Sequence, residues 1–322
     1  MKERNLGKSG LRVSIVGLGC NNLGGRLDRS ASRRVIHAAL DLGVTLFDTS
    51  DTYPRGNTGA SEQLLGETLG ARRREIVLAT KFGNPMDEAG RLKGGSRRYI
   101  LSAVEASLRR LKTDWIDLYQ MHNPDPLTPI EETLRALDDL VRQGKVRYIG
   151  SSNFAGWQAV EADWVAKHLG LNAFVSCQNE YSLVERRCDR ELFPAMQAYG
   201  LGFLPFFPLA SGLLTGKYKR GAPLPKHARL TNAKPLAECF LTERNYAIAE
   251  RLEGFCARRK RTLLELAFSW LLARPTVSSV IAGASNREQI EQNIRATEWA
   301  LPAEEMAEID RLTDAPASLP GG

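Results

Sequence analysis

The sequence predicts an α/β fold in which eight parallel strands close into a (β/α)8 TIM barrel. Eight short apolar segments, rich in β-branched residues, alternate with amphipathic helical segments along the chain. The apolar segments are hydrophobic throughout, as expected for strands that are covered on both faces. Many of them also end in a polar residue. A closed barrel would bring these ends to one rim, whereas the alternative, an open doubly wound sheet, would spread them along an edge.

The first element is expected to be a short β-hairpin, followed by the eight strand and helix units. Gly7-Lys8-Ser9-Gly10 provides turn chemistry between two segments that mix polar and apolar residues. Several of the helical patterns end at a glycine, as helix C-termini often do. The strands are expected at 13–19, 45–50, 76–81, 115–122, 146–153, 173–180, 201–208 and 277–283, and examples of the intervening helices are 30–43, 61–70, 97–111 and 130–144.

The regular spacing ends after the seventh strand. Residues 209–241 are rich in Gly, Pro and Lys and are expected to form an extended loop, which in a compact domain is often functional. Extra helices are expected near the C-terminus, at about 242–260, 262–273, 287–296 and 303–313. No linker divides the chain, so we expect one barrel domain over residues 1–322.

The composition of the chain indicates where in the cell the protein is expected. The chain is 43% hydrophobic and 25% charged, as globular proteins are, and contains no apolar run long enough to cross a bilayer. Its polar first residues, "MKERNLGKSGLRVS", lack the apolar core of a signal peptide. The five cysteines are scattered, which is typical of reduced cytosolic thiols. We therefore expect a cytoplasmic protein with no membrane partner.

The charge pattern does not indicate a nucleic-acid partner, although the net charge is +7. The Lys and Arg clusters fall at the ends or on the polar faces of expected helices, without interleaved aromatic residues. Such a basic balance can still steer an anionic cofactor or substrate. The four histidines lack metal-ligand spacing, so no metal is expected.

Four polar residues follow neighbouring strands two, three and four. Asp48 and Lys81 end "TLFD" and "IVLATK", Tyr53 lies five residues after Asp48, and His122 ends "WIDLYQMH". Each alone has an ordinary explanation, such as a turn carboxylate or a packed ring, but a barrel would gather them at one rim. A Tyr phenol has a pKa of about 10, and a nearby Lys81 held by Asp48 would lower it, making Tyr53 a general acid/base. A neutral His122 could donate a hydrogen bond to a carbonyl oxygen.

At these residues the sequence resembles the aldo-keto reductase family. The matching stretches are "GVTLFDTSDTY", "GASEQLLGETL", "VLATK", "DLYQMHNPD", "GSSNF", "CQNEYSL", "PLASGLLTGKY" and "GASNREQIEQN", in the family's order from about residue 4 to 295. The resemblance implies a reversible NADPH-dependent reduction of an aldehyde or ketone, with NADP(H) favoured over NAD(H). It implies that Tyr53 donates the proton, that Asp48 and Lys81 tune it, and that His122 orients the substrate carbonyl.

The resemblance also implies a cofactor site without a dinucleotide fingerprint. "GLGCNN" (17–22) has Asn22 in place of the third glycine, and no helix is expected to start there. Phe206 takes the position that stacks on the nicotinamide, and Phe207 replaces a small residue. Ser285 and Arg287, at an expected helix N-terminus, favour a 2′-phosphate, whereas Gln292 replaces a frequent Glu. The implied cofactor contacts are Ser152, Asn153 and Gln178 for the nicotinamide, the backbone N–H groups of Leu209, Ser211, Gly212 and Leu214 with Lys217 for the pyrophosphate, and Gly283, Ser285, Arg287, Gln289, Gln292 and Asn293 for the adenosine.

Two other functions are compatible with the sequence. Some members of the family are regulatory subunits that bind cofactor and pair with a membrane channel, and a barrel enzyme of unrelated chemistry, such as a phosphate-sugar isomerase, is a weaker alternative. The oligomeric state stays open. Substrate choice is expected to depend on the rim loops and the C-terminal tail, and several basic residues there indicate an anionic or sugar-like substrate. The loops are 20–29, 54–60, 83–96, 123–129 and 209–241, and the residues are Asn21, Arg26, Arg55, Phe82, Asn84, Arg91 and Lys93.

Overall fold

The computed structural model of the chain describes residues 1–226 and 228–313 and confirms the expected barrel. Eight parallel strands follow one another in the order β10-β3-β4-β5-β6-β7-β8-β9. The N–H of Phe203 donates to the Thr276 carbonyl at 2.7 Å, and the Ser278 N–H donates to the Phe203 carbonyl at 3.0 Å, which joins β9 to the segment leading into β10. The strands are β3 (Val16–Gly19), β4 (Leu46–Asp48), β5 (Val77–Phe82), β6 (Ile116–Met121), β7 (Val146–Ser152), β8 (Ser176–Gln178), β9 (Gly202–Phe203) and β10 (Val280–Ala282).

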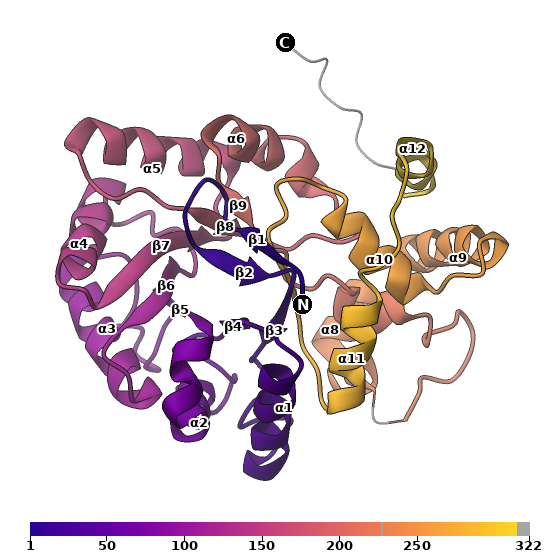
Figure 1. Ribbon diagram of the computed structural model, residues 1–322, viewed down its shortest axis with the longest axis horizontal. Coiled ribbons are helices and arrows are strands. Elements are labelled where there is room, and N and C mark those ends of the chain that lie inside the picture. Colours follow the sequence, from indigo (N-terminus) through magenta and orange to yellow (C-terminus); the bar gives the residue numbers. More distant parts are fainter. Residues whose placement is uncertain (227, 314–322) are drawn as a thin grey trace.

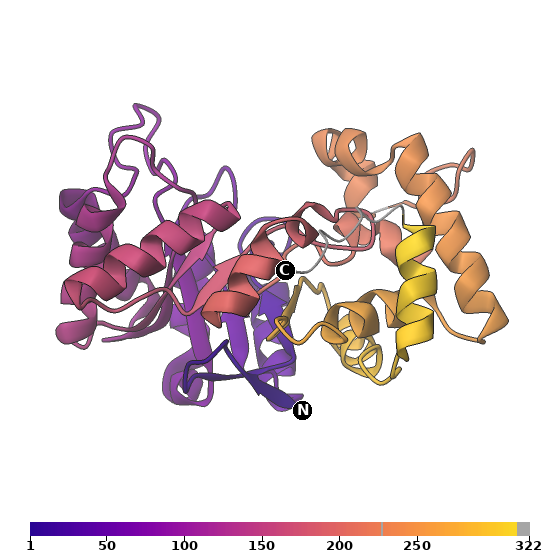
Figure 2. The same ribbon diagram turned by 90° about the horizontal axis from the view of Figure 1, so that it is seen from above.

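Helices cover the outside of the strands, as the alternating pattern predicts. Figures 1 and 2 show α2 to α5 around one side of the barrel, and α8 to α12 gathered on the other. None of the helices in the described part of the chain is long and apolar enough to cross a membrane. Apart from the segment 209–241, the helices are α1 (Arg29–Asp41), α2 (Ala60–Leu69), η1 (Gly70–Glu75), α3 (Arg97–Leu111), α4 (Ile130–Arg142), α5 (Gly156–Leu169), η2 (Arg187–Asp189), α6 (Leu192–Tyr199), α9 (Glu243–Arg258), α10 (Leu263–Leu272), α11 (Arg287–Arg295) and α12 (Ala303–Leu312).

The N-terminal hairpin closes the amino end of the barrel. Its strands β1 (Glu3–Asn5) and β2 (Arg12–Ser14) pair antiparallel, as expected. The turn between them lies against β9, and Gly7 is required there because a Cβ atom would come within 2.5 Å of the Gly200 carbonyl oxygen. Leu6 is fully buried and forms one apolar cluster with residues from four barrel strands and the segment after β9. That cluster contains Leu6, Val13, Leu46, Ala79, Leu118, Leu204 and Ile281.

Residues 209–241 differ from the expected extended loop. The segment contains η3 (Ala210–Thr215), α7 (Arg229–Asn232) and α8 (Lys234–Phe240). Helices of four to seven residues are too short for an apolar period to show in the sequence, and the many Gly and Pro residues of the segment conceal them further. The structure therefore forms a short helical layer next to the C-terminal ends of the strands, where the sequence indicated an extended loop.

Candidate active site

Asp48 and Lys81 form a buried ion pair at the C-terminal ends of β4 and β5. Lys81 Nζ lies 2.7 Å from Asp48 Oδ2 and donates to the Thr49 carbonyl at 2.9 Å, and the two charged side chains are 0% and 5% exposed. Burial lowers the pKa of Lys81, but the Asp48 carboxylate, Tyr53 and Cys20 together raise it by more, so the net pKa lies above its usual value. The lysine therefore stays charged inside the barrel.

Two amide side chains complete the hydrogen bonding of Asp48. The Nε2 groups of Gln178 and Gln120 donate to Asp48 Oδ1 at 2.8 and 3.3 Å. Gln178 was expected to contact the nicotinamide, and its amide nitrogen here is shared with the carboxylate. The sequence analysis assigned no role to Gln120. Its position two residues before His122, on the same face of β6, is the pattern that could have indicated it.

Tyr53 lies on the loop after β4 and faces both Lys81 and His122. Lys81 Nζ is 5.2 Å from the centre of the phenol ring, and the rings of Tyr53 and His122 meet edge to face at 5.7 Å between centroids. The expected lowering of the Tyr53 pKa does not occur. Burial raises this pKa, and Asp48 adds to the increase, by more than the Lys81 ammonium lowers it. Tyr53 therefore keeps its proton throughout the neutral range.

His122 follows β6 and is neutral, as expected. Burial and the nearby cations Lys81 and Arg55 lower its pKa to about 3. Its backbone N–H donates to the Phe82 carbonyl at 2.8 Å, and the Asn153 side chain donates to the His122 carbonyl at 2.9 Å. Ring atom Nδ1 lies 3.1 Å from Ser50 Oγ, which leaves Nε2 as the other polar atom of the ring.

We expect this lowered pKa to weaken the fold in acid. The folded protein holds His122 neutral down to about pH 3, whereas an unfolded chain protonates histidine near pH 6.5. The unfolded state therefore binds the extra proton between these values, and the free energy of unfolding falls as the pH drops through that window. Between pH 7 and pH 4 this group accounts for about 3 kcal/mol.

Urea unfolding of the wild type and of His122→Gln at the two pH values measures this contribution. The variant is expected to lose about 3 kcal/mol less than the wild type between pH 7 and pH 4. Equal losses in the two proteins would show that His122 is not held neutral by the fold.

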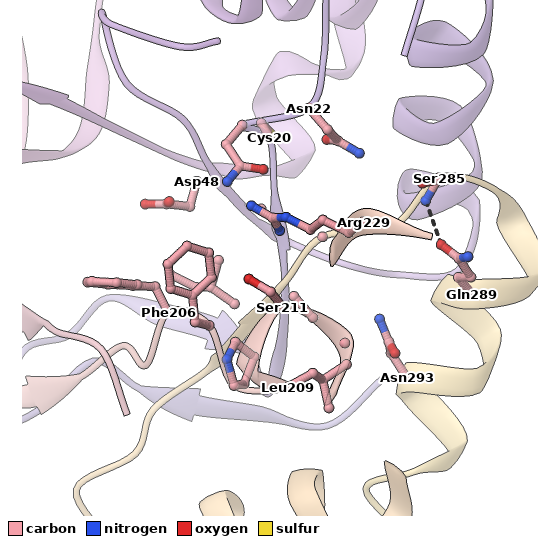
Figure 3. Close-up of a pocket in the computed structure, with 18 of the residues that line it drawn as sticks. Cys20, Asn22, Asp48, Phe206, Leu209, Ser211, Arg229, Ser285, Gln289 and Asn293 are labelled. Atoms are coloured by element: carbon pink, nitrogen blue, oxygen red, sulfur yellow. Dashed lines mark hydrogen bonds between the residues drawn. The ribbon is translucent and has the colours of Figure 1, made fainter. Parts of the chain in front are cut away.

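Asp48, Tyr53 and His122 line a cavity of about 650 Å³, whereas Lys81 is fully buried and pairs with Asp48. In the view of Figure 3, Asp48 and Phe206 lie at one end of this cavity, Ser285 and Gln289 lie at the other, and Arg229 lies between them. Most of the expected cofactor contacts line it. They are Ser152, Asn153, Gln178, Phe206, Leu209, Ser211, Gly212, Lys217, Gly283, Ser285, Gln289, Gln292 and Asn293.

The backbone of η3 departs from the expected anion contacts. The N–H groups of Gly212 and Leu214 both donate to the Leu209 carbonyl, at 2.8 and 3.2 Å, so the local turn already uses them. Leu214 is fully buried and lies outside the cavity lining. Ser211 provides a polar atom instead, because its Oγ is buried at the cavity and has no hydrogen-bond partner among the described residues. Its left-handed backbone, with φ of 55°, places it in this turn.

Three cations line the cavity without an anionic partner among the described residues. Arg26, Lys217 and Arg229 form no ion pair with any carboxylate of the described residues, and burial lowers the pKa of each. The Arg229 guanidinium stacks on the ring of Phe207, with 5.2 Å between its carbon and the ring centroid. Phe207, which replaces a small residue, therefore positions the charge of Arg229. Arg229 was not predicted from the sequence, because it begins a helix inside the segment expected to be a loop. A cluster of unneutralised cations favours an anionic ligand.

Arg287, which was expected to contact a phosphate at the adenosine end, lies outside the lining of the cavity. Arg287 begins α11 but pairs with Glu291 at 2.8 Å, is 54% exposed, and does not line the cavity. Asn286 caps the helix by accepting from the Gln289 N–H at 2.9 Å. Arg26, from the loop after β3, reaches across instead and donates to Ser285 Oγ at 3.2 Å.

Several rim residues named for substrate choice have other contacts. Phe82 is fully buried and packs on Tyr119 at 4.7 Å between ring centroids, so it belongs to the core. Asn84 accepts a hydrogen bond from Asn123 at 2.6 Å, and Arg91 lies 3.9 Å from Asp87 on the surface. The expected contribution of the C-terminal tail falls on residues 314–322, outside the described part of the chain.

Comparison with known proteins gives one family over most of the chain. Residues 15–314 match the sequence model of the "Aldo/keto reductase family". The chain is 37% identical to "Uncharacterized oxidoreductase YrpG" of Bacillus subtilis, over 98% of this chain and 97% of that protein. It is 36% identical to a "Probable voltage-gated potassium channel subunit beta" of Oryza sativa, over 92% and 91%. It is 34% identical to "L-glyceraldehyde 3-phosphate reductase" of Escherichia coli, over 97% and 92%.

Proposed function

Because the chain belongs to the aldo/keto reductase family, we propose that it reduces an aldehyde or ketone reversibly with NADPH, and that Tyr53 donates the proton. Family membership already makes the protein an NAD(P)H-dependent oxidoreductase that acts on carbonyl groups. The preference for NADPH and the roles of the residues are the proposal. The observation that carries it is the meeting of protonated Tyr53, charged Lys81 and neutral His122 at one end of the cavity.

The cavity fits a nicotinamide dinucleotide. The unpartnered Ser211 hydroxyl and the unneutralised cations Lys217 and Arg229 suit a diphosphate, and Phe206 offers a flat apolar face at the catalytic end. When bound, NADPH supplies the hydride that the carbonyl carbon receives. We propose that the remaining contacts come from Ser152, Asn153, Gln178, Leu209, Gly212, Gly283, Ser285, Gln289, Gln292 and Asn293.

The residues at the catalytic end would each have a separate role at the carbonyl oxygen. Nε2–H of neutral His122 donates a hydrogen bond that orients the oxygen and stabilises its growing negative charge. The Tyr53 hydroxyl then transfers its proton to that oxygen. Lys81 stabilises the phenolate that remains, and Asp48 holds Lys81 charged and in place. In the direction of alcohol oxidation the phenolate takes the proton back.

A turnover panel tests this function. Purified protein is given NADPH or NADH with neutral, sugar-like and anionic aldehydes and ketones, and the loss of absorbance at the nicotinamide band is followed. We expect turnover with at least one carbonyl compound, and a higher kcat/KM with NADPH. No oxidation of either cofactor with any substrate, together with no alcohol oxidation in reverse, would contradict the proposal.

The second candidate is a cofactor-binding channel subunit with little turnover. The 36% identity to a probable potassium channel subunit of rice supports it. The two candidates differ in turnover, which therefore distinguishes them. Tight NADPH binding without turnover, and a stable oligomer on size exclusion, would favour the subunit. Turnover with NADPH would favour the reductase. Loss of NADPH binding altogether would favour a barrel enzyme of unrelated chemistry.

We expect Arg26 to select NADPH over NADH. Its contact with Ser285 Oγ places the guanidinium at the adenosine end of the proposed site, where a 2′-phosphate would lie. A hydrogen bond to a charged group contributes about 1.5–3 kcal/mol, so Arg26→Ala should raise the Kd for NADPH by about 10- to 100-fold. The Kd for NADH, which has no such phosphate, should change little.

Fluorescence titration with both cofactors measures this difference, and Arg287→Ala is the matched control. Because Arg287 pairs with Glu291 outside the cavity, its loss is expected to leave both Kd values nearly unchanged. An equal rise in both Kd values for Arg26→Ala would place Arg26 on the diphosphate instead. A selective loss in Arg287→Ala would restore the assignment made from the sequence.

The domain organisation and cellular location complete the proposal. We propose one barrel domain across the chain, of which residues 227 and 314–322 lie outside the described part. We also propose a cytoplasmic location, because all five cysteines are unpaired, as is typical of a reducing compartment. The partner is a small carbonyl or alcohol substrate.

A further inference from the structure

A second carboxyl group is buried beneath the rim without a cation in contact. Asp51 is 1% exposed, and its N–H donates to the Lys81 carbonyl at 3.2 Å. Asp51 Oδ1 accepts from Ser50 Oγ at 3.0 Å, whereas Oδ2 has no hydrogen-bond partner among the described residues. The guanidinium of Arg110, whose charge acts on Asp51, pairs with Glu62 at 2.7 Å. A carboxylate in such a place is costly, so its protonated form competes.

Ser50 connects this carboxyl to the imidazole of the proposed active site. Ser50 Oγ lies 3.0 Å from Asp51 Oδ1, 3.1 Å from His122 Nδ1 and 3.1 Å from Thr52 Oγ1, and it accepts from the Thr52 N–H at 3.2 Å. All these groups lie at the C-terminal ends of β4 and β6. A serine hydroxyl has one proton, so it can donate to only one of its neighbours, and the Thr52 hydroxyl can itself donate to Ser50; Ser50 therefore donates to the carboxyl or to the imidazole, but not to both.

The position of that proton depends on the ionisation of Asp51. An ionised Asp51 accepts a hydrogen bond from the Ser50 hydroxyl. The contact between Ser50 and His122 is then a hydrogen bond only if Nδ1–H donates to Ser50 Oγ. In that state Nε2 carries no proton. A protonated Asp51 donates to Ser50, which then donates to Nδ1, and the imidazole proton resides on Nε2. The ring stays neutral in both states. Only the second state leaves His122 a donor for a substrate carbonyl.

We propose that Asp51, acting through Ser50, sets which ring nitrogen of His122 carries the proton, and that reduction requires the protonated Asp51. Asp51 is thereby a positioning residue, and this role rests on the proposed reductase function. The geometry makes the carboxyl a switch: it leaves the number of protons on His122 unchanged and moves one of them from one side of the ring to the other.

The surroundings place this switch near neutral pH. Burial, and then the charge of Glu62, raise the pKa of Asp51 to about 7, against the opposing effects of the Ser50 hydrogen bond and Arg110. The other titratable groups facing it are Tyr53 from its own loop, Tyr99 from α3 and Tyr119 from β6, and each has a pKa raised by burial. The pKa of His122 is about 3. Of these groups, Asp51 is therefore the one expected to titrate at neutral pH.

NMR of the full chain with 15N-labelled histidine tests the proposal without any substrate. The chain has four histidines, and His122→Gln identifies the signals of His122. Between pH 5.5 and 9 we expect neutral His122 to change from the Nε2–H to the Nδ1–H tautomer, with a midpoint near 7. Asp51→Asn should hold a single tautomer throughout. A single neutral tautomer of wild-type His122 over the whole range would overturn the proposal.

This measurement separates the switch from the reductase function, because the tautomer is read in the absence of turnover. Should Asp51→Asn fail to fold, Ser50→Ala replaces it, since it keeps the carboxyl and removes the connection. In Ser50→Ala the His122 tautomer is expected to be independent of pH. A change of tautomer near pH 7 that persisted in Ser50→Ala would overturn the proposed path through the serine.

The pH profile of carbonyl reduction provides a second test. In the wild type we expect kcat/KM to fall above pH 7 by up to about tenfold per pH unit. In Asp51→Asn this fall should disappear. The matched control is Asp138→Asn, which alters a buried carboxyl on α4 that accepts hydrogen bonds from Asn172 and is remote from the cavity. Its profile should keep the wild-type fall, and a fall that persisted in Asp51→Asn would contradict the proposal.

Discussion

Tyr53→Phe is expected to lower kcat for carbonyl reduction by about 10²- to 10⁴-fold, because general acid catalysis contributes rate factors of this size. The proposed mechanism requires a proton at the phenol oxygen, and the raised pKa of Tyr53 keeps one there at neutral pH. Phenylalanine preserves the ring that contacts Lys81 and His122, so the surrounding structure should persist. The loss should therefore appear in kcat, with the Kd for NADPH nearly unchanged.

Steady-state kinetics and cofactor titration on the same preparations measure this split. Tyr148→Phe is the matched control, because it removes a phenol oxygen from β7 that lies beside Gly10 of the hairpin, outside the cavity lining. The control is expected to reduce carbonyls at the wild-type rate. Full carbonyl reduction by Tyr53→Phe would show that another group donates the proton.

Lys81→Met is expected to cost about 3–5 kcal/mol of stability in addition to activity. The ammonium is fully buried, and its removal leaves the Asp48 carboxylate inside the barrel with only amide donors and no cation. Neutralising the carboxylate as well should remove most of this cost. The double variant Lys81→Met/Asp48→Asn is therefore expected to be more stable than Lys81→Met alone, although both lack the charge that stabilises the phenolate.

Urea unfolding of the two single variants, the double variant and the wild type at pH 7 forms a double-mutant cycle. Recovery of stability in the double variant would assign the loss to the unpaired carboxylate. Equal stability of Lys81→Met and the double variant would mean that Gln178 and Gln120 already satisfy Asp48 without the lysine.

The alternation of strands and helices made the barrel predictable, because each strand carried a local apolar pattern. The same pattern placed Asp48, Lys81 and His122 at strand ends, and a closed barrel brings the ends of neighbouring strands together. The ion pair of Lys81 with Asp48 follows from this placement. The short helices in 209–241 could not be predicted, because so few residues show no hydrophobic periodicity.

The electrostatics of the site were harder to predict from the sequence, because they depend on burial and on partners from distant segments. The cation near Tyr53 was predicted, but the loss of hydration that outweighs it is a property of the folded pocket. Arg287 was named for its place at a helix start, yet its neighbour Glu291 neutralises it. Arg26, from the loop after β3, contacts Ser285 instead, and no local pattern connects Arg26 with Ser285.

The hairpin at the amino end has a consequence for the order of folding during synthesis. Leu6 contacts barrel residues that include Ile281, and β3 pairs with β10, so the first segments made require partners among the last. At typical rates of translation the interval is on the order of tens of seconds. During that time the edge of β3 and the apolar face of the hairpin remain open to other chains. The nascent protein is therefore expected to depend on chaperones until β10 leaves the ribosome.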